Sequence, residues 1–266
     1  MQEYIKVEVV PADENVQLLE ELKRAVAAQD ISTIKRTGAE LEEKYGDQES
    51  VLKEVGLAYC SHEQTRKKGI ELLKFVAQKR ADVEAYWKLA EAYGIEQQWE
   101  ESALNYYRAG EIAGQEVDKA RFWIKAAYMY WLNHQYERAV EVAKEVLQIA
   151  QSVADPRLVQ VAKNSLAYYW AETGENPETA RKWCLEMLGV PDDEHFVDRI
   201  EKSTFEGERN SQVIDTLGRV VESLGRNLDA FRLYRKGNKI FPDQPVNVQN
   251  LARAYRKLGE EVPFGV

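Results

Sequence analysis

The sequence predicts an all-α protein built as a stack of antiparallel helix pairs, an α-solenoid. Its 266 residues are rich in helix-forming types and contain only 15 Gly and 7 Pro, fewer than a chain of many short strands requires. Apolar residues recur at offsets of three, four and seven, which places them on one face of a helix. This face itself recurs at intervals close to 34 residues, which is typical of helical repeat proteins.

The repeat unit is clearest at Tyr86. Tyr86, Leu89, Ala90 and Tyr93 share one helix face, and the polar residues 96–98 then predict a turn. A second helical set follows the turn and consists of Ser102, Tyr106 and Ala109. One unit is therefore a helix, a turn and a second helix.

The first-helix pattern occurs in four further copies. They begin at Leu52, Trp123, Ile214 and Val248, and the steps from Leu52 to Tyr86 and from Ile214 to Val248 are both 34 residues. A small residue stands at the fifth position of each copy, so that the second helix can approach closely. These small residues are Gly56, Ala90, Ala127, Gly218 and Ala252.

This pattern resembles the tetratricopeptide repeat (TPR) family, from about Glu49 to the C-terminus. The resemblance implies a right-handed superhelix of antiparallel helix pairs, here about six repeats plus a capping helix. Repeats of this kind are stabilised by stacking on their neighbours. The motif is specific to the fold and does not identify a partner.

The expected organisation follows the chain. Residues 1–11 form an extended tail, in which Tyr4–Val10 alternates like a strand and could instead pair with a partner's sheet. Residues 12–48 form a degenerate N-terminal helix pair, with helical runs at Asn15–Ala28 and Ile31–Tyr45. Residues 49–189 form the main array, and residues 209–266 form a C-terminal repeat and the capping helix, which could also be half of a truncated repeat in a longer protein.

Residues 190–208 interrupt the repeat interval. Lys163 and Ile214 stand 51 residues apart, one repeat and a half. We expect an extra helix near Asp193–Ser203 that packs Phe196 and Ile200, or alternatively a flexible acidic insertion. An unpaired helix would make this segment a hinge between two subarrays.

Composition and motifs argue against several classes of function. The net charge of −9 disfavours nucleic acid and anionic membranes as partners. The sequence has no phosphate-binding loop, nucleophile elbow or Cys-x-x-Cys pair, and His62 and His134 have no second ligand at helical spacing. His195 follows the acidic residues 192–194, a loose metal-like cluster that is more typical of a capped helix start. We therefore expect no catalytic residues, no metal, no cofactor and no small-molecule substrate. The two cysteines and the absence of a signal peptide or spanning segment predict a cytoplasmic protein.

First helices line the concave face of such a stack, and the positions beside their core residues face the groove. We predict that the partner-binding groove is formed by Lys53, Trp87, Lys88, Arg121, Lys125, Tyr128, Trp131 and Tyr168. Leu57, Glu84, Glu91, Ile124, Asn164 and Ser165 face the same way. The basic members could equally be ordinary solvated charges, and the aromatic members could pack between helices.

The basic residues are similar to the carboxylate clamp of chaperone-binding TPR proteins, which holds an acidic C-terminal tail. Lys53 matches a clamp lysine, and Arg121 and Lys125 occupy the lysine and arginine places with the types exchanged. Leu57 and Lys88 replace the two clamp asparagines, which argues against this ligand.

We therefore expect a non-catalytic scaffold or adaptor that binds a protein or peptide segment in its groove. The alternative is a regulatory protein that senses a peptide or other ligand and changes its superhelix across residues 190–207. RNA binding is a third possibility, which the acidic net charge opposes.

Overall fold

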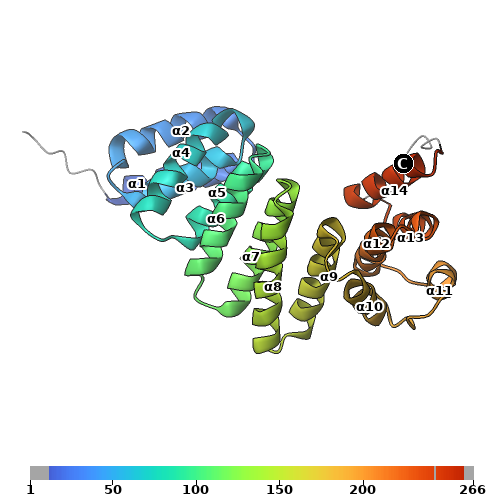
Figure 1. The fold of residues 1–266 in the computed structure, drawn as a ribbon. Helices are drawn as coiled ribbons and strands as arrows, with labels where there is room; N and C mark the ends of the chain where they lie inside the picture. Colours follow the sequence, from blue (N-terminus) through green and yellow to red (C-terminus); the bar gives the residue numbers. More distant parts are fainter. Residues whose placement is uncertain (1–11, 243, 261–266) are drawn as a thin grey trace, which may run out of the picture. The chain divides into compact units, whose positions relative to one another are not determined.

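The computed structural model describes residues 12–242 and 244–260, and this part contains fourteen α-helices and no strand (Figure 1). The predicted all-α repeat fold is therefore confirmed. The predicted tail, with its alternating Tyr4–Val10, lies outside the described residues.

The chain divides into two compact units, Met1–Phe122 and Trp123–Val266. The first contains α1 (Ala12–Ala27), α2 (Ile31–Tyr45), α3 (Glu49–Cys60), α4 (Glu63–Lys79), α5 (Val83–Ile95) and α6 (Trp99–Ile112). The boundary falls within α7 (Glu116–Leu132). The second contains α8 (Tyr136–Ser152), α9 (Pro156–Thr173), α10 (Pro177–Leu188), α11 (Phe196–Lys202), α12 (Glu208–Ser223), α13 (Asn227–Ile240) and α14 (Pro245–Lys257).

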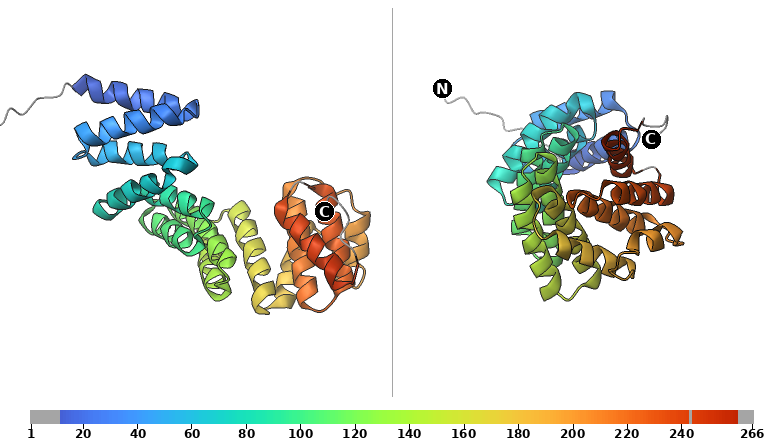
Figure 2. Two further views of the ribbon diagram at one scale, coloured as in Figure 1. Left: turned by 90° about the horizontal axis from the view of Figure 1, so that it is seen from above. Right: turned by 45° about the vertical axis from the view of Figure 1, so that its right-hand side comes forward.

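In the first unit each helix packs on the next along the chain, and alternate helices α1, α3 and α5 also touch. Figure 2 shows this order as a progression from blue to green. Local sequence sets the helix starts. The side chain of Asp82, for example, accepts a hydrogen bond from the Ala85 N–H at the start of α5. Helices in this order are what a stack of antiparallel pairs requires.

The small residues of the repeat lie where helices come closest. Ala90 and Ala127 are buried. A Cβ at Gly56 would lie 3.0 Å from the side chain of Leu73, and one at Gly218 would lie 2.7 Å from the ring of Tyr234. The fifth position of the repeat is therefore small because a side chain of the second helix occupies the space.

The second unit continues the stack past residues 190–208. This segment contains α11, whose Phe196, Val197 and Ile200 are buried, and α11 packs on α13. The helix α11 does not separate the repeats on either side of it, because α12 packs directly on both α9 and α10. We expected a break between subarrays here, but the boundary between the compact units falls earlier, within α7. An extra helix that packs on the outside of a repeat leaves the stacking of its neighbours intact.

Candidate functional site

The eight predicted groove residues are divided between the two units. Lys53, Trp87, Lys88 and Arg121 belong to the first, and Lys125, Tyr128, Trp131 and Tyr168 belong to the second. The structure shows the surroundings of each group within its own unit.

Lys53 is held by two carboxylates. Its Nζ lies 3.1 Å from Oδ2 of Asp82 and 2.9 Å from Oε2 of Glu84. Hydrogen bonding to Glu84, with a further contribution from Asp82, raises the pKa of the ammonium despite the opposing effect of burial. The lysine therefore stabilises the junction between α3 and α5, and its charge is already balanced.

The aromatic and basic pair on α5 is also occupied. The Trp87 indole N–H donates to Oε1 of Glu91 at 2.7 Å, and its ring lies 6.1 Å from that of Phe122. The Lys88 ammonium lies 4.3 Å from the Trp87 ring centre and 2.9 Å from Oε2 of Glu91. Arg121 pairs with Asp118 at 3.2 Å. The carboxylates around these cations would repel an acidic tail, so the first unit does not reproduce a carboxylate clamp.

The first unit has instead a largely apolar pocket of about 450 Å³ between α1, α3 and α5. Leu22, Val26, Leu57 and Ile95 line it. Lys88, one of the predicted groove residues, is also among the lining residues.

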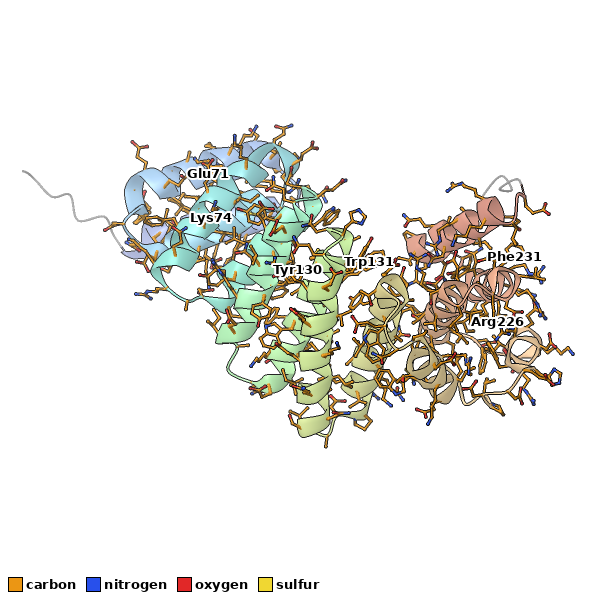
Figure 3. The ribbon with its side chains drawn as sticks, viewed as in Figure 1. Glu71, Lys74, Tyr130, Trp131, Arg226 and Phe231 are labelled. Atoms are coloured by element: carbon orange, nitrogen blue, oxygen red, sulfur yellow. The ribbon has the colours of Figure 1, made fainter. Side chains whose placement is uncertain are left out.

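In the second unit the predicted aromatic residues come together. Tyr128 stacks on Trp131 on α7, with ring centres 5.8 Å apart and planes at 14°. Trp131 projects toward α9 (Figure 3), where its ring meets the edge of Tyr168 at 5.3 Å and 71°. Burial raises the pKa of the Tyr168 hydroxyl well above its usual range. Three of the eight predicted residues thus form one aromatic cluster, whereas Lys125 is exposed outside it.

This cluster is one wall of a pocket of about 250 Å³ formed by α7, α9, α12 and the start of α14. The opposite walls are polar. The pocket is lined by Ile124, Tyr128, Trp131, Asn164, Ser165, Tyr168, Tyr169, Gln212, Asp215, Thr216, Gln244, Val246 and Asn247. Pockets for drug-sized ligands span about 300–1,000 Å³. A cavity below that range suits one large side chain of a longer ligand.

Five fully covered polar atoms of the lining residues have no hydrogen-bond partner among the described residues. They are Nε1 of Trp131, Oδ1 of Asn164, Oδ1 of Asp215, Oε1 of Gln244 and Oδ1 of Asn247. Each unsatisfied buried group costs about 1–3 kcal/mol. Such groups are rare in native proteins, and each needs a partner from outside the described residues, either an ordered water or a ligand.

Asp215 is the buried acid of the pocket, and its residue is only 3% exposed. Its Oδ2 accepts a 2.7 Å hydrogen bond from Nδ2 of Asn250 on α14. Burial raises the pKa of Asp215 to about 7, although the hydrogen bond from Asn250 and the charges of Arg253 and Arg219 act in the opposite direction. Its carboxyl group is therefore partly protonated at neutral pH.

The two arginines near Asp215 have other partners. Arg219 forms a close ion pair with Glu172 and lies 3.3 Å from Oε2 of Glu222. Arg253 lies 2.8 Å from the same oxygen of Glu222. Glu222 also accepts a 2.8 Å hydrogen bond from the buried hydroxyl of Tyr234. These arginines pair with Glu172 and Glu222, and Asp215 forms no ion pair among the described residues.

The polar wall on α12 and α14 was missed at the sequence level, although the signal was present. Counted from the first large residue of each copy, the groove positions are one, two and five residues later. The rule yields Ile124, Lys125 and Tyr128 in the copy that begins at Trp123. Applied to the copies that begin at Ile214 and Val248, it yields six residues: Asp215, Thr216, Arg219, Gln249, Asn250 and Arg253. Of these residues only Asp215 and Thr216 line the pocket, and its other polar residues on this side, Gln212, Gln244 and Asn247, do not follow from the rule.

Other kinds of site have little support in the described part of the chain. It contains no group of three or more His, Cys, Asp or Glu residues placed to hold a metal ion. None of its helices combines the length and the apolar character needed to cross a membrane. Burial raises the pKa of both thiols, Cys60 and Cys184, to about 12, so neither is a ready nucleophile.

No protein-family model matches the sequence, and no curated protein matches it significantly. Solved structures do match the fold. The apo form of RapI matches with a TM-score of 0.62 and 16% identity, covering 96% of this chain and 77% of that one. A Rap protein complexed with competence and sporulation factor matches with a TM-score of 0.56 and 18% identity, covering 94% of this chain and 72% of that one. The apo form of the quorum sensor NprR from B. thuringiensis matches with a TM-score of 0.53 and 18% identity, covering 97% of this chain and 74% of that one.

The protein is thus a helical-repeat solenoid with a TPR-like fold, as the repeat pattern indicated. The first helices line pockets in both units.

Proposed function

We propose that this protein is a non-catalytic binding protein that captures a polypeptide segment, with the pocket of the second unit as its specific anchor site. The observation that carries the proposal is the cluster of five unpartnered polar atoms beside three aromatic rings. A peptide supplies both donors and acceptors along its backbone, and its side chains can insert into a small cavity. The size of the pocket matches an anchor of this kind.

The test is selection from a library of blocked hexapeptides by the purified full chain, followed by titration of the enriched peptides. We expect at least about tenfold weaker binding in Tyr128→Ala and Asn164→Ala, because each removes a lining contact worth about 1.4 kcal/mol or more. Leu228→Ala, at a position 63% exposed on α13, is the matched control and should bind as the wild type does. Retention of no peptide, or unchanged affinity in the two pocket variants, would refute the proposal.

A second candidate is regulatory sensing, in which the captured segment changes the shape of the protein. The likeness to the quorum sensor NprR and to a Rap protein complexed with competence and sporulation factor supports this candidate. Small-angle scattering with and without an enriched peptide separates the two. A sensor changes its radius of gyration on binding, whereas a static adaptor keeps it.

A further inference from the structure

The pocket of the second unit has an excess of hydrogen-bond acceptors. Four of its five unpartnered atoms are oxygens, on Asn164, Asp215, Gln244 and Asn247, and one is the N–H of Trp131. A ligand that satisfies them must therefore bring several donors and few acceptors. A carboxylate or phosphate has only acceptors, so the chemistry of the pocket excludes both.

Hydrogen bonds between α12 and α14 fix two of the acceptor groups in position. The amide nitrogen of Asn247 donates to Oγ of Ser211 at 2.7 Å. This bond orients the side-chain amide, and its Oδ1 has no partner among the described residues. Ser211 in turn donates to the carbonyl of Gly237 at 3.0 Å. Asn250 holds one oxygen of Asp215 and leaves the other without a partner. Both Asn247 and Asp215 are more than nine-tenths buried.

The aromatic wall adds a preference for a flat cation. The rings of Tyr128, Trp131 and Tyr168 present π-faces and edges within one cluster. A guanidinium group stacks on such rings and is more weakly hydrated than an ammonium, so it enters a buried site at lower cost. It also carries five donors in a fixed plane, against three on an ammonium.

We propose that the pocket binds a guanidinium group, with Asp215 as its counter-charge and the oxygens of Asn164, Gln244 and Asn247 as further acceptors. The inference rests on the proposed peptide capture when the group is an arginine side chain. The same chemistry could come from a free small guanidine. Because the acceptor atoms are covered in the free protein, binding requires side chains of the pocket lining to move.

Binding of the cation is coupled to a proton. Asp215 is partly protonated near pH 7 in the free protein, and an adjacent guanidinium favours its ionised form. The groups around Asp215 that share this balance are Arg219 and Glu222 on α12, Tyr168 and Glu172 on α9, Tyr234 on α13 and Arg253 on α14. Binding therefore releases a proton, and affinity rises with pH until Asp215 is ionised in the free protein.

The experiment is calorimetric titration of the full chain with three blocked tripeptides that differ only in the central residue: arginine, citrulline or lysine. Citrulline keeps the shape of arginine and removes its charge. We expect the arginine peptide to bind at least about thirtyfold more tightly than the citrulline peptide, and Asp215→Asn to abolish this preference. Binding of the arginine peptide should be about tenfold tighter at pH 8 than at pH 6. The control is Asp47→Asn, at an exposed position in the first unit, which should change neither value.

The outcomes separate this inference from the proposed function. Equal binding of arginine and citrulline peptides, or of arginine and lysine peptides, overturns the guanidinium site, while library peptides can still bind. Binding of agmatine, a free guanidine, without binding of any peptide supports the guanidinium site and overturns peptide capture. Failure of agmatine, the tripeptides and the library alike overturns both.

Discussion

Asn250 on α14 donates a 2.7 Å hydrogen bond to one oxygen of Asp215 on α12, while the other oxygen of Asp215 has no partner among the described residues. This half-satisfied carboxyl group lies beside the aromatic cluster of the second unit. A buried acid that is neither paired nor fully hydrogen-bonded reduces stability, and binding sites commonly contain such groups.

The first prediction concerns Asp215→Asn. The pKa of Asp215 in the folded protein is about 7, above the ordinary aspartate value of 3.8. Between pH 4 and pH 7 the folded protein therefore keeps a proton on Asp215 that the unfolded chain has lost. Stability is therefore lost as pH rises from about 4 to 7, by up to roughly 4 kcal/mol from this group. The asparagine variant lacks this loss and should be more stable than the wild type at pH 8, with a much smaller difference at pH 4. Denaturant titrations at both values, with Asp47→Asn as control, check this; a difference independent of pH would contradict it.

The second prediction concerns Glu222, whose side chain is only 4% exposed. Burial alone would raise its pKa, but hydrogen bonds from Lys257, Arg253 and Tyr234 outweigh burial and lower the pKa to about 2. The pairing stabilises the fold above pH 4.5 and is lost as pH falls toward 2. Glu222→Gln should cost about 3 kcal/mol at pH 7, because it removes a buried carboxylate that balances the partly buried Arg219 and Arg253.

The matched control for Glu222 is Glu178→Gln. Glu178 pairs with Arg181 at 2.8 Å, but its side chain is 65% exposed. An exposed pair contributes at most about 1 kcal/mol. Thermal unfolding of both variants checks this. Similar losses of stability in Glu222→Gln and Glu178→Gln would contradict the prediction that the buried network around Glu222 stabilises the fold more than an exposed ion pair does.

The third prediction concerns Gly218→Ala. The new Cβ would lie 2.7 Å from Cε1 of Tyr234, whose hydroxyl is held by Glu222 and Arg253 at 2.8 and 3.1 Å. The ring cannot move away without breaking these bonds, so overpacking of about 1–3 kcal/mol should exceed the gain in helix propensity of about 1 kcal/mol. A lower unfolding midpoint is expected. Gly114→Ala, where no atom lies within 4 Å, should be neutral or slightly stabilising.

The fourth prediction concerns Lys53→Gln. The substitution removes the partner of Asp82 and Glu84, and we expect a loss of about 1 kcal/mol or less because this cluster is partly exposed. Peptide binding in the second unit should be unchanged. Weaker binding of enriched peptides to Lys53→Gln, but not to Lys144→Gln at an exposed pair on α8, would assign Lys53 a direct role in capture.

Much of this architecture could be predicted from the sequence. The helix faces at Leu52, Tyr86, Trp123, Ile214 and Val248 repeat because each helix pair must bury one face internally and another against its neighbour. A small residue at a fixed place in the pattern reports the closest helix approach, and Gly56 and Gly218 show this contact. The aromatic half of the pocket followed from the same periodicity, since Tyr128, Trp131 and Tyr168 stand beside core positions and must point elsewhere.

The ion pairs and the polar wall could not be predicted in the same way. Lys53 meets Asp82 and Glu84 from the next repeat, so its availability depends on which carboxylates a neighbouring helix presents. The boundary between compact units falls within α7 and not at the irregular segment 190–208, because packing of α12 on α9 and α10 bridges that segment.

Periodicity in this chain specifies the helices, their pairing and the side of each first helix that turns away from the core, since these depend on local spacing and on burial of apolar faces. Folding decides which polar atoms find partners. The unpartnered oxygens of Asp215, Asn247 and Asn164, which come from three separate helices, lie around one pocket. Satisfaction of a buried polar atom depends on geometry between segments distant in the chain, and no local pattern contains that information.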